Sequence, residues 1–318
     1  DTTWFDAVLF KDDRSGEGID GCGLSVGPPL CSGPDSSSGS VEIMELLTQR
    51  TCCACSSDQS ERVERIVSPV AAAQLDFDEF KEYWRGFRSR QCFFDYERCS
   101  TCGLLYCPNY FTQEALDALY ASMDDNTAGE ASDVLSRTQA RYIDFLREHS
   151  SDAETYLEIG PDIGLSSRIA LQNSTIRRAV FVEPNRDVHP ELRELASRIS
   201  CTVTTDLELL TSAANADEAV LVHVLDHLLE PVGYLNNLVD HLAPGAVVLI
   251  VVHNEQSILR KLLRTRWPPF CLQHPQLYSP SSLEHVLNSS GLEVIDVRPT
   301  TNVFTLRHCV RMAGDLVG

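Results

Sequence analysis

Positive charge is scarce in this chain. Its 318 residues include 26 lysines and arginines against 46 aspartates and glutamates, which gives a formal net charge of −20. Proteins that bind a nucleic-acid backbone usually gather lysines and arginines on one surface, because these side chains neutralise phosphates. The composition therefore argues against nucleic acid as a partner.

Long apolar runs are also missing. No stretch approaches the roughly 20 apolar residues that cross a bilayer, and the N-terminus lacks the charged-then-apolar pattern of a secretory signal. The sequence therefore predicts a cytoplasmic protein without a membrane partner. Hydrophobic residues make up 43% of the chain, which is typical of a globular protein, and the length favours about two domains.

The first 43 residues differ in composition from the rest. Residues 12–40 are rich in Gly, Ser, Pro and Asp and lack sustained periodicity, so they bury too little apolar area to offset the entropy of ordering. The chain begins with Asp, and Met44 would make a natural start. We expect residues 1–43 to be a disordered or non-native leader.

A glycine turn stands at the centre of the chain. The apolar segment Thr155–Ile159 runs into Gly160 and Gly164 and then into a helical pattern. A strand that breaks on glycine and restarts as a helix lets backbone N–H groups face a polar ligand. A second apolar segment ends in Glu183, where a carboxylate can accept both hydroxyls of a ribose. The pair indicates a nucleotide-type site.

The G-x-G-x-x-G pattern of dinucleotide-binding proteins is absent from this turn. Its third position is Asp162 and its sixth is Leu165, which disfavours NAD. Glu158 before the turn and Asp162 within it would repel a pyrophosphate, but they suit the ammonium and sulfonium of S-adenosylmethionine.

At this point the chain resembles the class I S-adenosylmethionine-dependent methyltransferases. Their first motif has the form acid-x-Gly-x-Gly-x-Gly, with Asp162 here in place of the middle glycine. Thr202–Asp206, Glu218–Pro231 and Ala246–His253 resemble the third, fourth and fifth strand motifs, and 237–242 resembles the helix before the fifth. The resemblance implies an α/β fold with a Rossmann-like, doubly wound, mostly parallel seven-stranded sheet.

The same resemblance implies which residues contact the cofactor. They follow the ends of the first four strands, where ligands of doubly wound sheets bind. These residues are Glu158, Gly160, Pro161, Asp162, Gly164, Glu183, Pro184, Asn185, Asp206, Leu207, His223, Val224 and Leu225.

Two Cys-x-x-Cys pairs form the second signal. Four thiolates at this spacing suit one tetrahedral Zn²⁺, and Gly103 supplies the positive φ that turns backbone N–H groups toward sulfur. Free or redox-active thiols and disulfides remain alternatives, and Cys53 or Cys107 could replace a ligand. The pairs are Cys52 with Cys55 and Cys99 with Cys102.

The second pair carries a further resemblance. Cys99–Asn109, followed by Thr112–Tyr120 with Thr112 as its N-cap, resembles the zinc-binding module of bacterial methyltransferases acting on sugars or natural products. It implies a zinc-ribbon-like module at 44–125 and a methyltransferase domain at 126–318. Aromatic residues at 77–94 favour additional strands in the module.

The acceptor side is marked by histidines. His253 closes the fifth strand and His274 lies in a loop that resembles a substrate-facing segment, so we take both as catalytic candidates. His227 matches the family motif and is expected to organise its turn. The sequence leaves two roles open for Trp267, Phe270 and Tyr278, namely lining an acceptor pocket or packing in the core.

Periodicity predicts the remaining elements. We expect helices at 131–150, 257–264 and 279–290, a sixth strand at 292–297, and a strand or short helix at 303–310. Two alternatives to a methyltransferase stay open. One is a zinc-ribbon regulator or adaptor in which Asp162 and Asp226 mark a non-catalytic domain; the other is a NAD-dependent oxidoreductase with a structural zinc.

Overall fold

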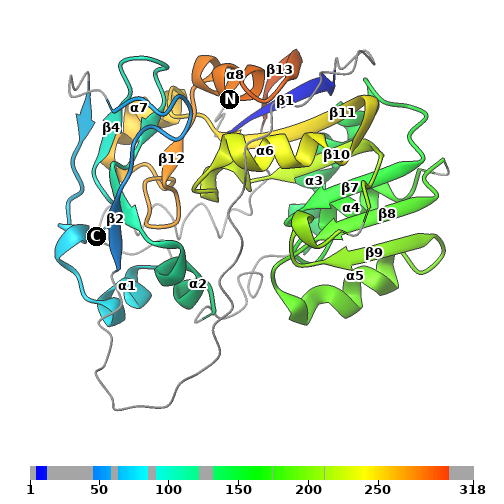
Figure 1. The fold of residues 1–318 in the computed structure, drawn as a ribbon, viewed down its shortest axis with the longest axis horizontal. Helices are drawn as coiled ribbons and strands as arrows, with labels where there is room; N and C mark the ends of the chain where they lie inside the picture. Colours follow the sequence, from blue (N-terminus) through cyan, green and yellow to red (C-terminus); the bar gives the residue numbers. More distant parts are fainter. Residues whose placement is uncertain are drawn as a thin grey trace, which may run out of the picture.

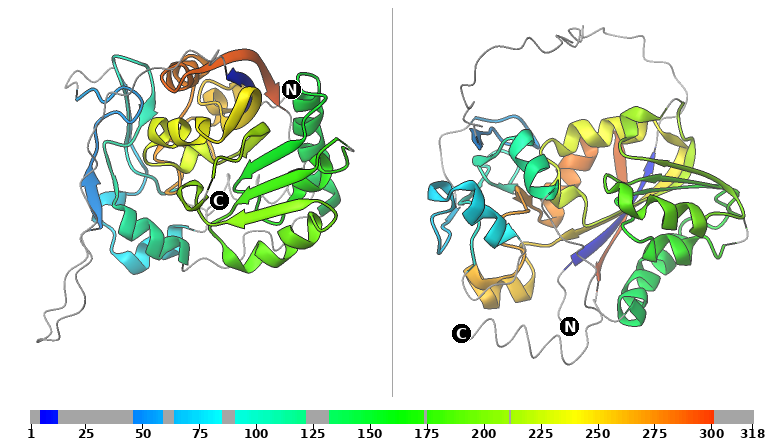
Figure 2. Two further views of the ribbon diagram at one scale, coloured as in Figure 1. Left: turned by 45° about the vertical axis from the view of Figure 1, so that its right-hand side comes forward. Right: turned by 90° about the horizontal axis from the view of Figure 1, so that it is seen from below.

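The computed structural model describes residues 5–12, 46–58, 64–84, 91–121, 132–173, 175–210 and 212–300. They form two parts that lie side by side, a large sheet flanked by helices and a smaller part with short strands (Figure 1). Figure 2 shows the same two parts from two other directions. Among the described helices, none has the length and apolar composition needed to cross a membrane.

The large sheet has the strand order β13-β1-β11-β10-β7-β8-β9. Its five neighbours from β11 to β9 are parallel, which confirms the predicted α/β fold with a mostly parallel sheet. Each predicted strand of this group is present. They are β7 (Thr155–Ile159), β8 (Arg178–Val182), β9 (Ser200–Thr204), β10 (Ala216–Val222) and β11 (Leu242–His253), and the predicted sixth strand is β13 (Leu292–Thr300).

A strand from the N-terminus completes this sheet. β1 (Phe5–Asp12) lies between β11 and β13 and runs antiparallel to both. The prediction of disorder is therefore wrong for these eight residues. The segment is too short to show a pattern by itself, and its partners lie at the other end of the chain. The rest of 1–43, and the strand or helix predicted at 303–310, lie outside the described residues.

Helices cover both faces of the large sheet. α3 (Ser132–Arg147), α4 (Leu165–Ala170) and α5 (His189–Leu195) pack on one face with Tyr156, while α6 (Pro231–Val239) and α8 (Pro280–Asn288) pack on the other with Leu157. Successive strand residues point to opposite faces, so both faces are apolar. The helices predicted at 131–150 and 279–290 are confirmed. The one predicted at 237–242 is wrong in its bounds, because α6 ends at Val239 and β11 begins at Leu242.

The smaller part contains two short sheets. One has the order β12-β5-β4-β3, and the other pairs β2 with β6. The strands are β2 (Leu47–Gln49), β3 (Arg65–Ile66), β4 (Tyr96–Arg98), β5 (Leu105–Tyr106), β6 (Asn109–Phe111) and β12 (Gln276–Leu277). β12 and the buried rings of Trp267 and Phe270 come from the C-terminal half of the chain. Residues assigned to the second domain thus complete the sheet and core of the first.

Two helices close the smaller part, α1 (Phe77–Trp84) and α2 (Gln113–Ala121). The prediction of strands at 77–94 is wrong for α1. Asp76 and Glu79 exchange backbone-to-carboxylate hydrogen bonds of 2.9 Å, which is a capping box. Phe80 and Trp84 are four residues apart and buried on one face. Thr112 caps α2 as predicted, because its hydroxyl accepts from the Ala115 N–H at 3.2 Å.

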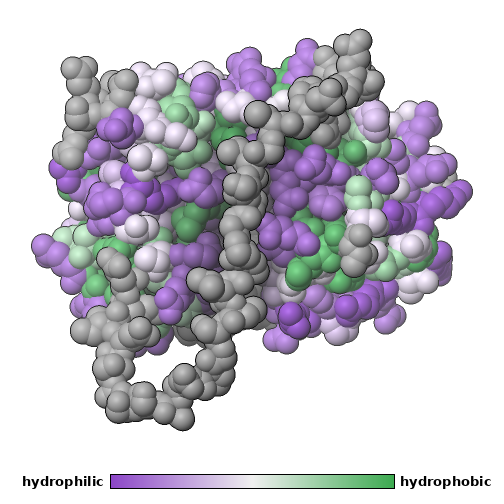
Figure 3. All heavy atoms as spheres, in the orientation of Figure 1, coloured by the Kyte–Doolittle hydropathy of each residue, from purple (hydrophilic) through white to green (hydrophobic). Residues whose placement is uncertain are grey.

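On the face shown in Figure 3, hydrophilic side chains predominate and hydrophobic ones form separate patches. Two exposed apolar side chains, Ile258 and Leu262, belong to α7 (Ile258–Leu263), which confirms the helix predicted at 257–264. Ser257 begins this helix, since its side chain accepts from the Arg260 N–H. α7 follows β11 directly and leads into the loop that carries His274.

Candidate active site

The glycine turn after β7 has the backbone that the sequence predicted. Gly160 and Gly164 have φ angles of 64° and 74°. A Cβ at Gly160 would lie 2.9 Å from the Val224 side chain, and one at Gly164 would lie 2.8 Å from Leu195. Asp162 also takes a positive φ of 51°, so an aspartate adopts the left-handed backbone at the position of the middle glycine.

Glu183, which follows β8, is bound to this turn. Its Oε2 accepts a hydrogen bond of 2.9 Å from the Asp162 N–H, and its Oε1 accepts one of 2.8 Å from the Asn185 N–H. The His189 ring nitrogen lies 2.7 Å from the Glu183 carbonyl oxygen. The two motifs that the sequence places 21 residues apart therefore meet at one edge of the sheet.

Glu158 is turned into the protein. It is 2% exposed, and its Oε2 accepts from the Tyr156 hydroxyl at 2.7 Å and from the Ser167 hydroxyl. Burial raises the pKa of Glu158 to about 7, although these hydroxyl groups favour the charged form. Of the two acids near the turn, Asp162 is exposed, whereas Glu158 is buried and accepts hydrogen bonds from β7 and α4.

The other predicted cofactor residues lie at the same edge, because β7 to β10 are parallel and end together. Asp206 is exposed after β9, and its carboxylate accepts from the Glu208 N–H at 3.1 Å. Val224 touches the glycine turn. Apart from Glu158, which lies within β7, the predicted set follows the ends of these four strands, with Pro161 and Leu207 buried and Pro184 and Asn185 exposed.

A cluster of imidazoles lies at the ends of β10 and β11, where His274 is buried and His223, His227 and His253 are partly buried. The His253 ring centroid is 5.0 Å from that of His223 and 4.7 Å from that of His274, and His227 is 4.7 Å from His274. His223 has a positive φ of 55°, a strained backbone for a residue that is not glycine. The structure thus brings together both catalytic candidates.

Asp226 completes this cluster and was not predicted as a site residue. It lies in the short 3-10 helix η4 (Leu225–His227) and is 0% exposed. Its Oδ2 lies 2.5 Å from His253 Nδ1 and accepts from the His253 backbone N–H at 3.1 Å. The sequence placed Asp226 in the fourth motif. Its partner His253 is 27 residues away, so no local pattern indicated their contact.

Burial sets the protonation of the cluster. It lowers the pKa of His223, His227 and His253 well below the usual value, lowers that of His274, and raises that of Asp226 to about 7. Neighbouring histidines disfavour a second positive charge on the first three. The imidazoles are therefore neutral near pH 7.

His274 is held in place by the smaller part. Its Nδ1 lies 2.7 Å from the Pro269 carbonyl oxygen, so this nitrogen donates and Nε2 is left unprotonated. The Tyr96 hydroxyl donates to the His274 carbonyl oxygen at 2.6 Å. Arg98 binds Glu255, two residues after His253, through contacts of 2.9 and 3.1 Å. The smaller part thus fixes the loop and strand end that carry both histidines.

The three aromatic residues of this loop are fully packed. Trp267, Phe270 and Tyr278 are 0%, 0% and 1% exposed. Phe270 stacks on Phe93, and the Tyr278 hydroxyl donates to the Leu225 carbonyl oxygen at 3.2 Å. Of the two roles left open by the sequence, packing fits these contacts.

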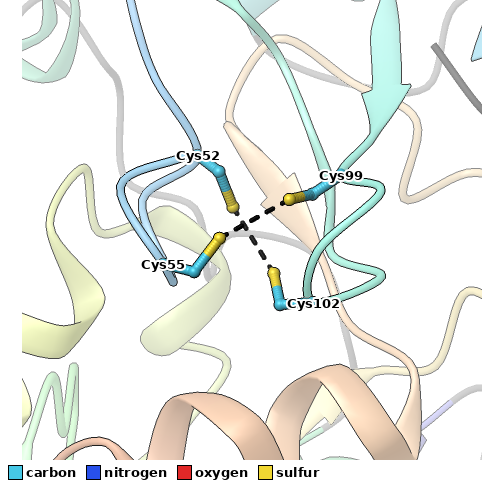
Figure 4. A group of neighbouring side chains, drawn as sticks. All are labelled: Cys52, Cys55, Cys99 and Cys102. Atoms are coloured by element: carbon cyan, nitrogen blue, oxygen red, sulfur yellow. Dashed lines mark hydrogen bonds between the residues drawn. The ribbon is translucent and has the colours of Figure 1, made fainter. Parts of the chain in front are cut away.

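The four predicted cysteine ligands converge on one point (Figure 4). Their sulfurs all lie within 4.8 Å of one another, with 3.5 Å between Cys52 and Cys102 and 3.6 Å between Cys55 and Cys99. Zn–S bonds of about 2.3 Å at tetrahedral angles place sulfurs roughly 3.8 Å apart. The arrangement fits Zn²⁺, and the sulfurs are far too distant for a disulfide bond.

The two Cys-x-x-Cys turns share one backbone pattern. The N–H groups of Ser56 and Gly103 donate to the carbonyl oxygens of Cys52 and Cys99, at 2.7 and 2.9 Å. Ser56 and Gly103 both have positive φ, 55° and 77°, as predicted for Gly103. The alternative ligands lie elsewhere. Cys53 contacts Gln276, and Cys107 contacts the Phe94 carbonyl oxygen.

Comparison with known proteins identifies one family model that matches the chain. It describes a methyltransferase domain and covers residues 132–297, which is 166 of the 318 residues. A comparison with curated proteins finds no match.

Several solved structures resemble the chain. One is an S-adenosylmethionine-dependent methyltransferase from Thermotoga maritima, described as a possible histamine N-methyltransferase, with 16% identity, a TM-score of 0.40, and coverage of 51% of this chain and 73% of that one. Another is the N-methyltransferase NodS from Bradyrhizobium japonicum with S-adenosylhomocysteine, at 20% identity, a TM-score of 0.33, and 43% and 70% coverage. A third is an amino pentose methyltransferase from Micromonospora echinaspora, at 18% identity, a TM-score of 0.32, and 44% and 56% coverage.

Proposed function

Because the chain belongs to the methyltransferase domain family, we propose that it transfers a methyl group from S-adenosylmethionine to a small-molecule acceptor of the sugar or natural-product type. The observation that carries this proposal is the contact between the glycine turn and Glu183 at the carboxyl edge of the parallel sheet. In doubly wound sheets this edge is where ligands bind.

The residues at this edge fit the cofactor. A Cβ at Gly160 would clash with the Val224 side chain, so glycine lets the turn lie close to the end of β10. Asp162, Glu183 and Asp206 supply acidic oxygens around it, suited to an ammonium, a sulfonium and ribose hydroxyls. We assign Glu183 to the ribose and Asp206 to the adenine side, as the family resemblance implies.

S-adenosylmethionine supplies a methyl carbon activated by a sulfonium, so the protein mainly has to align the acceptor, exclude water and remove a proton. We assign proton removal to His274, because its Nδ1–H is bound to Pro269 and leaves Nε2 as an acceptor. His253 orients the acceptor from the end of β11, and burial of the cluster keeps both imidazoles neutral.

The four-cysteine cluster is assigned to one structural zinc ion. Four thiolates fill a tetrahedral site and leave no position for water or substrate. The site ties the turn after β2 to the turn after β4, next to Arg98, which binds Glu255. In this way the metal supports the acceptor side without taking part in the chemistry.

The adaptor alternative rested on Asp162 and Asp226 as marks of a lost activity. Asp162 keeps the left-handed backbone of the turn, and Asp226 is bound to His253, so neither residue favours it. Calorimetric titration of the wild-type protein with S-adenosylmethionine and with NAD tests the proposal. Heat with the first cofactor alone supports it, whereas binding of NAD alone, or of neither, contradicts it.

A further inference from the structure

Three metal-ligating side chains meet inside the histidine cluster, away from the cysteines. One ligand atom from each of His223, Asp226 and His253 lies within 4.8 Å of the others. They come from the end of β10, from η4 and from the last residue of β11. Three neighbouring elements therefore hold the group, and none of its members lies in an extended loop.

The donor set differs in kind from the cysteine cluster. Two imidazoles and one carboxylate are typical of sites for zinc, iron and related divalent ions, and three protein ligands leave positions open for an oxygen ligand. The four-cysteine site is closed, because its ligands already complete a tetrahedron. The two clusters thus have the composition of a catalytic and a structural metal site.

Burial and charge favour a cation at this place. Asp226 is 0% exposed, and its Oδ1 has no hydrogen-bond partner among the described residues. Within that part of the chain, its one ion pair is with His253. A buried carboxylate with a free oxygen is costly unless a positive charge compensates it. A divalent ion would provide that charge and use the free oxygen.

We propose that His223, Asp226 and His253 bind a divalent transition-metal ion at an open site, and that its free positions take an oxygen atom of the methyl acceptor. The acceptor part of this inference rests on the proposed function, whereas the metal site does not. An oxygen held on a cation loses its proton more readily, and His274, whose ring lies 4.7 Å from His253, stands next to it as the proton acceptor. The acceptor class is thereby narrowed to hydroxyl compounds.

The test is metal stoichiometry with Co²⁺ as the probe. Purified full-length protein is stripped of metal, titrated with Co²⁺, and analysed for bound metal and for near-ultraviolet and visible absorption. Thiolate ligands give an intense sulfur-to-cobalt absorption that nitrogen and oxygen ligands lack, so the two sites are distinguished by spectrum. We expect about two ions per chain, one for each ligand set.

Variants assign the second ion. Asp226→Ala and His253→Ala should each lose one equivalent and keep the sulfur-to-cobalt absorption, which also shows that the smaller part remains folded. His285→Ala, on α8 outside the cluster, is the matched control and should keep both ions.

Saturation of the wild-type protein at one Co²⁺ with full sulfur-to-cobalt absorption would overturn the proposal. Retention of two ions by both Asp226→Ala and His253→Ala would overturn it as well. The wild-type titration alone decides the question if a variant fails to fold. Failure of the proposed function has a separate signature. A protein that binds two ions but no S-adenosylmethionine would support the metal site and contradict the proposed methyltransferase function.

Discussion

His253 Nδ1 lies 2.5 Å from Asp226 Oδ2, and the same carboxylate oxygen accepts the His253 backbone N–H. The carboxylate therefore fixes both the position and the ring orientation of this histidine. This contact joins the segment after β10 to the end of β11. It lies on the side of the sheet edge that we assign to the acceptor. The proposed acceptor site is centred on this contact.

His274 is the residue whose loss should affect chemistry most. His274→Ala should lower the single-turnover rate on an accepted substrate by on the order of a hundredfold, the usual scale for a lost general base. Affinity for S-adenosylmethionine should stay near that of the wild type, because the cofactor contacts come from other strand ends. His285→Ala is the control. A rate within about threefold of the wild type, which is only about 0.65 kcal/mol of barrier, would remove His274 from the mechanism.

Glu158 should make stability depend on pH. Its pKa is raised to about 7 by burial, so the folded state holds a proton that the unfolded state releases above its ordinary pKa near 4.5. The contribution of this group therefore falls as pH rises from about 4.5 to 7. Glu158→Gln removes it, and the variant should gain stability relative to the wild type across that range.

Urea unfolding of the two proteins at several pH values measures this difference. Glu284→Gln, an exposed change on α8, serves as the control for the loss of one carboxyl group. A difference between Glu158→Gln and the wild type that is constant with pH would mean that Glu158 is charged in the folded protein at pH 5.

The strand β1 should contribute strongly to stability. The backbone of Val8 pairs with Ile250 of β11 and Val297 of β13, so proline at this position would disrupt an internal strand. Val8→Pro should lower the free energy of unfolding by about 1 to 3 kcal/mol, because it removes a ladder hydrogen bond and leaves a backbone partner unpaired; denaturant unfolding measures the change. Val8→Ala keeps the N–H group and is the matched control. Equal stability of the two variants would contradict the placement of β1 inside the sheet.

The four-cysteine site should be needed to fold the smaller part. Cys99→Ser should lose the thiolate-bound metal and the near-ultraviolet circular dichroism of the packed aromatic rings, because metal binding and folding are coupled in small metal modules. Cys201→Ser, on β9, should keep both signals. A Cys99→Ser protein with unchanged aromatic signals would show that the cluster is not structural.

The sequence predicted the parallel strands and the cysteine turns, because each of them is determined by residues that are adjacent in the chain. Four of the five parallel strands are apolar runs, whereas Ser200–Thr204 was expected from the family resemblance. The glycines and acids that follow the strands lie at one edge because parallel strands end together. The two cysteine pairs were predicted for a similar reason, since each turn is encoded by adjacent residues and ligand chemistry brings the turns together.

Long-range pairing was the part that the sequence did not reveal. Phe5–Asp12 forms a strand by pairing with β11 and β13, which lie at the other end of the chain. The contact between Asp226 and His253 joins residues 27 positions apart and depends on how two strand ends align. At Phe77–Trp84 aromatic content suggested a strand, whereas the capping box and the helical spacing of buried rings produced α1.

Glu183 provides the most direct test of the central claim, that this sheet edge binds S-adenosylmethionine. Calorimetry should detect binding by the wild-type protein and a loss of about 1 to 3 kcal/mol for Glu183→Ala, the scale of a hydrogen bond to a charged group. Glu191→Ala, exposed on α5, controls for the change in net charge and should bind as the wild type does. Equal affinity of Glu183→Ala and the wild type, with both proteins folded, would contradict the account.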